Sequence, residues 1–344
     1  MKKIKVGLVG YGFSATVFHT PLLSVLDEFH ISKVMSSNPE KVKSDLEDVE
    51  VVSTLSELLE DDSIDLVIIT TPSGMHYEMV KDALRAGKHV IVEKPMVVSE
   101  KEANELIQLA KEQDVQLSVY HNRRWDNDYL TVKQLIEEGK LGDVKMYEAH
   151  FDRYRPAVRD RWRENEGPGS GALYDLGSHL IDQALHLFGM PEFVQADVFG
   201  QRDHARTDDY FHVVLGYGSL RVILHSSAIV PSNGPRFQVH GTKASYIKYG
   251  IDGQEDMLRA GKKPVDDTWG ADSPEHYGKL TTGEGETKEI QTLHGSYVTY
   301  YQKIADSLLR GEELPVSAEE ARDVVKVIEA AFESSKEKRA VYFN

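Results

Sequence analysis

Regular alternation of strand-like and helix-like segments in the first third of the chain constrains its fold more than any other feature. Short apolar runs rich in β-branched residues are typical of buried parallel strands, and they lie at 4–9, 30–37, 65–72, 89–95 and 115–120. Segments with helical character separate them at 20–29, 56–61, 76–87 and 99–113. This alternation predicts an α/β domain with a doubly wound parallel sheet, that is, a Rossmann fold.

After residue 120 the regular alternation of strand-like and helix-like segments ends. We expect helices at 128–138, 171–188, 296–310 and 317–335. Between them, segments of alternating apolar and polar residues predict strands at 193–200, 210–217, 220–228, 236–242 and 244–250. The Gly- and Asp-rich stretch 250–290 is expected to be loop. The sequence therefore predicts a second, α+β domain with a large, mostly antiparallel, open-faced sheet, and divides the chain into 1–122 and 123–344.

Composition excludes several functional classes. The net charge of -16 argues against nucleic-acid and anionic-membrane partners. The chain contains no cysteine, which excludes disulfides and thiolate chemistry. The apolar run at the N-terminus is short and interrupted by glycine, so we do not expect a secretion signal, and no other run is long enough to span a membrane. We expect a cytoplasmic protein.

A glycine turn follows the first predicted strand. It reads Gly10-x-Gly12-x-x-Ala15, with Phe13 and Ser14 inside it. In a βαβ unit the first glycine permits the tight turn, the second lets backbone amides approach a pyrophosphate, and the third small residue allows close helix packing. The alternative is an ordinary turn, but the strand before it and the rhythm after it favour a dinucleotide site.

The end of the second predicted strand discriminates between cofactors. An acidic side chain there would bind the ribose hydroxyl of NAD. This chain instead has Ser36, Ser37 and Asn38, followed by Lys41. Their donors and positive charge suit a 2′-phosphate, so NADP is favoured over NAD. The alternative is that these residues only form the turn and the helix cap.

Further polar residues lie at other strand ends. In open α/β sheets ligands bind outside the carboxyl ends of the strands, where Glu93 and Lys94 precede a proline. Lys94 is therefore expected to face the nicotinamide. Weaker candidates for cofactor contact at the neighbouring strand end are Thr71, Pro72 and His76.

Four polar residues share one side of the helix expected over 171–188. Asp175, His179, Asp182 and His186 lie opposite a face of leucines. One interpretation is a solvated stripe, and a second is a metal site, for which we find no ligand signature and which we do not expect. The third is proton transfer by His179, oriented by Asp175 one turn earlier.

The combination of the glycine turn, "EKP" and "GALYDLGSHLID", followed by a β-sheet domain, resembles the Gfo/Idh/MocA family (glucose–fructose oxidoreductase / inositol dehydrogenase) over nearly the whole chain. The blocks after residue 120 look closest to a branch that includes NADP-dependent scyllo-inositol dehydrogenases. The resemblance implies that Lys94, Asp175 and His179 form the catalytic set, and that Lys94–Pro95 is a cis bond. It also implies a cyclic polyol or sugar as substrate, and a homodimer or homotetramer formed through the sheet.

Other substrate contacts are expected from the domain junction and from the arginine-rich segment 153–163. That segment is interpreted as a lid or polyol clamp, or alternatively as a solvated basic loop or a subunit contact. Asn122 and Arg123 at the junction are also candidate cofactor contacts. The candidate substrate-binding residues are Lys94, Asn122, Trp125, Asp152, Tyr154, Trp162, Asp175 and His179.

These residues together predict an oxidoreductase that moves a hydride between NADP(H) and a secondary alcohol or ketone. His179 would take the hydroxyl proton and Lys94 would stabilise the developing alkoxide, although Lys94 could itself carry the proton. Two other classes stay open: another dehydrogenase or reductase of the same family, and a non-enzymatic regulator that senses dinucleotides. The regulator could dispense with the three catalytic residues, all of which are present here.

Overall fold

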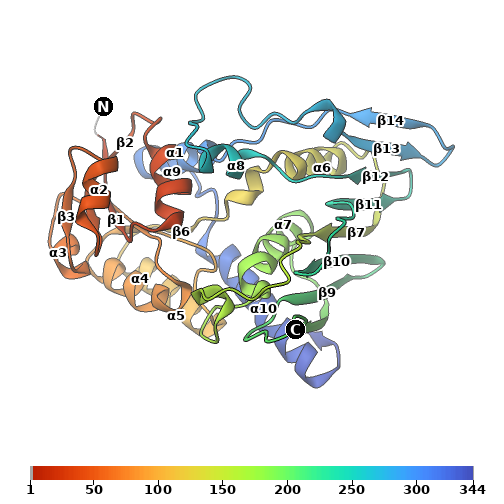
Figure 1. Cartoon of the computed structure of the whole chain (residues 1–344), viewed down its shortest axis with the longest axis horizontal. Helices are drawn as coiled ribbons and strands as arrows, with labels where there is room; N and C mark the ends of the chain where they lie inside the picture. The colour runs from red at the N-terminus through yellow and green to blue at the C-terminus, as the bar shows by residue number, and fades with distance from the viewer. Residues whose placement is uncertain (1–2, 344) are drawn as a thin grey trace. The chain divides into compact units, whose positions relative to one another are not determined.

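A computed structural model describes residues 3–343, which form two compact units (Figure 1). The first unit contains the chain up to Asn122 together with two later segments, Gln254–Trp269 and Ser296–Arg322. The second unit contains Arg123–Gly253, Gly270–Gly295 and the chain from Asp323 onward. The predicted division places everything after residue 122 in one domain, whereas these two later segments pack with the first unit.

A six-stranded parallel sheet forms the centre of the first unit. Its order is β3-β2-β1-β4-β5-β6, and the strands are β1 Ile4–Val9, β2 Phe29–Met35, β3 Glu50–Val52, β4 Leu66–Ile69, β5 His89–Val92 and β6 Leu117–Val119. This arrangement confirms the predicted doubly wound sheet. The order reverses at β1, and in doubly wound sheets ligands bind outside the carboxyl ends of the strands at such a reversal, which here are β1 and β4.

Helices of the first unit pack on its sheet. Helix α4 contacts β4, β5 and α5, while α1 contacts β2 and α9. Side chains of Asn38, Thr54 and Ser99 cap α2, α3 and α5 by accepting backbone hydrogen bonds. The helices are α1 Thr20–Leu23, α2 Pro39–Asp45, α3 Leu55–Leu59, α4 His76–Arg85, α5 Glu100–Glu112, α8 Gln254–Arg259 and α9 Val298–Arg310.

The second unit is built on a nine-stranded sheet of order β14-β13-β12-β11-β7-β10-β9-β8-β15. All neighbouring strands are antiparallel except β7 and β10, which confirms the mostly antiparallel prediction. The strands are β7 Val144–His150, β8 Phe193–Phe199, β9 Tyr210–Tyr217, β10 Leu220–Ser227, β11 Phe237–Gly241, β12 Ala244–Lys248, β13 Gly278–Thr282, β14 Thr287–Ile290 and β15 Val341–Tyr342.

One face of this sheet forms the core of the second unit. Buried side chains of α6 (Asn127–Glu137), α7 (Ser178–Phe188) and the later turns of α10 (Ala318–Glu337) pack there with strand residues such as Tyr147 and Phe211. Strand residues alternate between this core and the opposite face, where side chains such as Glu148 and His150 are only partly buried. No helix within residues 3–343 is long and apolar enough to cross a bilayer.

Three sequence-based expectations were wrong in detail. The stretch 250–290, expected to be loop, contains α8, β13 and β14. Strand β14 is largely exposed, so it lacks the apolar alternation that signals a strand. The helix expected over 20–29 ends at Leu23. The helix expected over 171–188 is α-helical only from Ser178, because a π-helical turn, Leu173–Gly177, precedes it.

Candidate active site

The glycine turn after β1 has the backbone geometry that a dinucleotide requires. Gly10 has φ +91°, a left-handed conformation that favours glycine, and a Cβ there would meet Thr70 Oγ1 at 3.0 Å. A Cβ at Gly12 would have no neighbour within 4 Å, so its backbone is open to an approaching group. Ala15 is fully buried, consistent with the close packing expected at the third position. These residues fit a bound pyrophosphate.

Lys41 brings a cation to this turn. Its Nζ donates to the Tyr11 carbonyl oxygen at 3.3 Å and lies 5.6 Å from the Tyr11 ring centroid. Asn38 caps α2 by accepting from the Lys41 amide at 3.1 Å, and Ser36 Oγ accepts from the Asn38 amide at 3.1 Å. The predicted cap and the predicted charge are thus both present, and the Ser37 side chain is exposed beside them.

Glu93 connects the glycine turn to the segment that carries Lys94. The Ser14 hydroxyl donates to the Glu93 carboxylate, and His19 Nε2 lies 3.0 Å from the same oxygen. The other ring nitrogen of His19 contacts the Tyr301 hydroxyl at 2.5 Å. Glu93 Oε2 also accepts from the Lys94 amide at 3.1 Å. His19 and Tyr301 were not among the predicted site residues, because sequence gives no sign that residue 301 lies beside residue 19.

Glu93 should make the stability of the protein depend on acidic pH. Burial alone would raise its pKa, but His19, Ser14 and the charge of Lys94 outweigh this effect and lower the pKa to about 2. Because the folded pKa lies below the unfolded value near 4.5, the stabilisation is present above pH 4.5 and is lost as pH falls toward 2. We expect Glu93→Gln to remove up to about 3 kcal/mol of unfolding free energy at pH 7 and to flatten its decline below pH 4.5.

Denaturant unfolding at a series of pH values measures this effect. The exposed Glu40 provides a control, since Glu40→Gln should leave the wild-type pH dependence intact. A Glu93→Gln curve parallel to that of the wild type would contradict the assignment.

The buried ring of His76, the first residue of α4, contacts backbone from two segments that follow β4 and β5. Its fully buried ring lies 2.9 Å from the Thr71 carbonyl oxygen through Nε2 and 2.9 Å from the Pro95 carbonyl oxygen through Nδ1. Burial lowers its pKa, and the two carbonyl contacts partly oppose that effect. The ring thus joins the segment containing Thr71 and Pro72 to the one carrying Lys94. The Lys94–Pro95 peptide bond is cis, which confirms the expectation.

In the second unit, Asp175 and His179 flank the junction between the π-helical turn and α7. Asp175 lies in the turn and His179 in the first turn of α7. Arg163 Nε contacts Asp175 Oδ1 at 3.3 Å, and about a quarter of the Asp175 side chain is exposed. His179 is 7% exposed, and its ring lies edge-on to Phe151 with centroids 6.5 Å apart. π-Helical turns are frequent at functional sites, and this one shifts Asp175 from its α-helical register.

Arginines surround a small hollow beside Asp175. The hollow measures about 60 Å³ and is lined in part by Arg153, Arg155, Arg161, Arg163 and Arg202. Glu164 pairs with two of these, contacting Arg161 Nε at 2.6 Å and Arg202 Nη2 at 3.0 Å. Glu164 therefore offsets part of the positive charge around the hollow. The arginine-rich stretch is neither a fully solvated basic loop nor an uncompensated cationic pocket.

Asp182 forms a buried ion pair, so the solvated interpretation of the polar stripe was wrong for it. Arg124 donates to both carboxylate oxygens, through Nε at 2.9 Å and Nη2 at 2.7 Å. The side chains of Arg124 and Asp182 are 4% and 2% exposed. His186, one turn further, is exposed, and its Nδ1 contacts the Tyr129 hydroxyl at 2.7 Å.

Comparison with known proteins places this arrangement in a family. Residues 4–121 match the model "Oxidoreductase family, NAD-binding Rossmann fold" and residues 133–343 match "Oxidoreductase family, C-terminal alpha/beta domain". Over 341 residues the chain is 59% identical to the scyllo-inositol 2-dehydrogenase (NADP(+)) IolW of Bacillus subtilis, covering 98% of this chain and 95% of that protein. The chain belongs to the Gfo/Idh/MocA oxidoreductase family.

Solved structures agree with this assignment. The putative oxidoreductase yvaA of Bacillus subtilis has a TM-score of 0.98 at 58% identity, covering 100% of this chain and 99% of that chain. The putative oxidoreductase YPO2259 of Yersinia pestis has a TM-score of 0.95 at 43% identity, covering 100% and 98%. The protein is accordingly an NAD(P)-binding oxidoreductase, and the expected family and enzyme class are confirmed.

The predicted site residues at the domain junction are buried or partly buried. Asn122 is buried, at 5% exposure, and Trp125 is partly buried. The Arg123 guanidinium lies 5.2 Å from the Phe151 ring centroid and donates to Asp126 at 3.3 Å. The ring contact and the hydrogen bond together hold the Arg123 side chain within the second unit.

Three predicted substrate contacts lie in or near the arginine-rich segment. Tyr154 is 60% exposed, whereas Trp162 is partly buried with the Arg163 guanidinium 4.5 Å from its ring centroid. Asp152 follows Phe151, which points into the core beside His179, and its own carboxylate contacts His150 and His225 on the opposite face of the sheet. The structure thus brings Phe151, rather than Asp152, next to His179.

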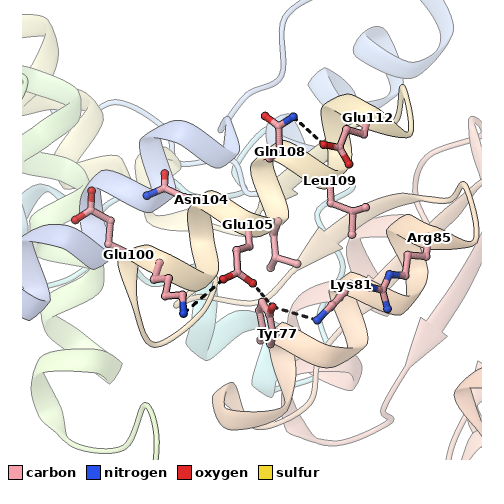
Figure 2. Close-up of a pocket in the computed structure, with 11 residues that line it drawn as sticks. Tyr77, Lys81, Arg85, Glu100, Asn104, Glu105, Gln108, Leu109 and Glu112 are labelled. Carbon is pink, nitrogen blue, oxygen red and sulfur yellow. Dashed lines mark hydrogen bonds and ion pairs between the residues drawn. The ribbon is translucent and has the colours of Figure 1, made fainter.

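A broad hollow between α4 and α5 lies apart from the predicted cofactor and catalytic residues. It measures about 850 Å³ and lies on the first unit (Figure 2). Its polar groups bond to one another: Tyr77 donates to Glu105, and Lys81 Nζ donates to the Tyr77 hydroxyl at 3.2 Å. Its lining contains none of the predicted cofactor or catalytic residues, so the oxidoreductase function does not assign it a role.

Proposed function

We propose that this chain is an NADP-dependent dehydrogenase that interconverts a secondary alcohol of a cyclic polyol and the corresponding ketone, with scyllo-inositol as substrate. The observation that carries the proposal is 59% identity, over 98% of the chain, to a scyllo-inositol 2-dehydrogenase that uses NADP(+). The Lys41 cation beside the glycine turn supports NADP in particular. The chain has no cysteine, and we propose a cytoplasmic, reducing location for it.

The bound nicotinamide would supply the hydride acceptor, and the chain's own residues would hold the substrate and manage one proton. During oxidation the hydroxyl proton passes to the His179 imidazole, and in reduction the same group returns it. Asp175, held by Arg163 at 3.3 Å, orients His179 or binds an adjacent hydroxyl. Lys94 donates to the reacting oxygen and stabilises negative charge as it develops there.

Absorbance at 340 nm tests the proposal directly. NADP⁺ or NAD⁺ is incubated with inositol isomers and aldoses, and the reduced cofactors with the corresponding keto compounds. We expect turnover with scyllo-inositol and NADP⁺, and with the 2-keto compound and NADPH. A chain that binds NADPH by fluorescence titration and yet turns over no polyol would refute the substrate class. It would also favour a dinucleotide-sensing protein.

Lys41 should determine part of the preference for NADP over NAD. Replacing it with alanine removes the cation that would pair with a 2′-phosphate, so we expect kcat/KM for NADP⁺ to fall about tenfold while that for NAD⁺ changes less than twofold. Lys43 of the same helix provides a matched control, since Lys43→Ala should leave both values near wild type. Equal losses with both cofactors would exclude a role in recognising the phosphate.

Association of copies through the nine-stranded sheet is the second part of the proposal. On its partly buried face, apolar side chains such as Val214 and Ile223 alternate with the core residues of β9 and β10. Light scattering coupled to size exclusion at micromolar concentration is expected to give the mass of a dimer or tetramer. Ile223→Lys should shift that mass toward the monomer, whereas a monomeric wild type would contradict the proposal.

A further inference from the structure

A row of polar side chains crosses the partly buried face of the nine-stranded sheet. In the strand register, His225 of β10 lies opposite His150 of β7 on one side and His212 of β9 on the other. His212 in turn lies opposite Asp197 of β8. Neighbouring residues of one register position project from the same face, so three imidazoles are brought together here. None of them belongs to the proposed dehydrogenase site.

Asp152 completes a set of three ligand-type side chains with His150 and His225. One candidate ligand atom from each of the three side chains lies within 4.8 Å of the other two. Asp152 Oδ2 lies 3.3 Å from His150 Nδ1, and Asp152 Oδ1 lies 3.5 Å from His225 Nε2. Around a zinc ion with bonds of about 2.0–2.2 Å, tetrahedral ligand atoms stand roughly 3.3–3.6 Å apart. Both contacts have this length, one to each carboxylate oxygen of Asp152, so small side-chain rotations would bring one oxygen and the two ring nitrogens around a single ion.

Hydrogen bonding around the cluster favours an ion over a finished network of hydrogen bonds. His150 Nε2 is buried without a hydrogen bond and lies 3.7 Å from Glu148 Oε2. If His150 donated from Nδ1 to Asp152, the lone pair on Nε2 would face the Glu148 carboxylate. An ion bound at Nδ1 would instead place the proton on Nε2, where it points toward Glu148.

The surroundings provide the support and access that a metal site needs. The Ser227 amide donates to Asp152 Oδ1 at 3.0 Å, and Gln238 Nε2 donates to Glu148 Oε2 at 3.0 Å, so both carboxylates are held in place. His150 and Asp152 line a hollow of about 40 Å³, enough for one water molecule beside an ion. The side chains of His150 and His225 are 23% and 18% exposed in the single chain, and they lie on the sheet face through which copies are proposed to associate.

The geometry points to a binding site for a divalent transition-metal ion, such as Zn²⁺, formed by His150, Asp152 and His225. Two imidazoles and one carboxylate suit zinc, and with three protein ligands a fourth position would be taken by water. The site holds β7 to β10 through side chains, in addition to their parallel ladder. It is independent of the proposed dehydrogenase reaction, and it departs from the sequence-based expectation of no metal.

Titration of tag-free, chelator-treated protein with Zn²⁺ tests the site. We expect one strong site per chain by calorimetry. Co²⁺ should give the intense absorption between about 500 and 650 nm that marks a tetrahedral environment. His150→Gln and His225→Gln should each weaken Zn²⁺ binding at least tenfold. His240→Gln is the matched control, because His240 lies on the neighbouring strand β11 and bonds to Ser245 instead.

The variants also show what would overturn the inference. Wild-type protein that binds no Zn²⁺, or variants at 150 and 225 that retain its stoichiometry and affinity, would eliminate the site. Circular dichroism checks the fold of each variant. Should His225→Gln fail to fold, Asp152→Asn decides in its place, since it keeps the shape of the side chain and removes the anionic ligand. Binding by Asp152→Asn at wild-type strength would count equally against the site.

Discussion

A His179→Ala variant is expected to lose about 10²–10⁴-fold in kcat, the usual contribution of a positioned general base. The loss corresponds to about 2.7–5.5 kcal/mol of transition-state stabilisation. The imidazole would receive the hydroxyl proton at the moment of hydride transfer, and alanine leaves no group there to accept it. Steady-state rates at 340 nm measure the effect. Fluorescence titration should show unchanged affinity for NADPH, which separates a chemical defect from a binding defect.

The pH profile distinguishes the two candidate proton carriers. If His179 carries the proton, the acidic limb of kcat/KM in the direction of oxidation disappears in His179→Ala and persists, at much lower rate, in Lys94→Met. Near-normal turnover and an unchanged profile in His179→Ala would transfer the role to Lys94. His186→Ala is the matched control from the same helix. The exposed His186 contacts the Tyr129 hydroxyl, and its loss should change kcat less than twofold.

Asp182→Asn is expected to lower the free energy of unfolding by about 3–5 kcal/mol, the largest stability effect we predict for a single polar substitution. The change preserves the shape of the side chain and removes the negative charge that accepts from Arg124 Nε at 2.9 Å and Nη2 at 2.7 Å. The buried guanidinium then loses the charge of its bidentate partner, and removing one member of a buried ion pair is costly. Denaturant unfolding followed by two spectroscopic probes measures the change.

A double substitution separates the value of the pair from the cost of breaking it. Replacing both partners, Arg124→Met with Asp182→Leu, should restore most of the lost stability, because neither charge of this pair remains buried. The exposed pair between Lys133 and Glu137 on α6 supplies the comparison, since Glu137→Gln should cost less than about 0.5 kcal/mol. A loss below 1 kcal/mol in Asp182→Asn would mean that water reaches Arg124 and that the pair is not shielded from solvent.

Local sequence signals were sufficient for the parts of the fold that depend on near neighbours. The glycine turn, the parallel strands and the Asn38 cap are each encoded within a few residues, and each is present. The π-helical turn at Leu173–Gly177 escaped prediction because one additional residue in a turn leaves the apolar spacing almost unchanged. Strand β14 escaped because its exposed residues carry no apolar alternation.

Contacts between residues distant in sequence could not be predicted from local sequence patterns. The ion pair of Asp182 was not predicted, because its partner Arg124 lies 58 positions away. Asp152 was expected beside the substrate, although strand alternation alone would have placed it opposite the buried Phe151. The catalytic roles of Lys94, Asp175 and His179 come from the family resemblance and stay a prediction. The structure describes the surroundings of Asp175 and His179 in one unit and those of the Lys94 segment in the other.

The discontinuous make-up of the first unit bears on how the chain emerges from the ribosome. Tyr300 and Tyr301 of α9 are fully buried against Tyr120, and Tyr301 also contacts His19, so part of this unit's interior is synthesised late. The nucleotide-binding half therefore cannot complete its core during translation until about residue 322 has left the exit tunnel. Contacts of such long sequence separation slow folding. The first unit therefore begins to be synthesised first, but its core is completed only after most of the chain has been made.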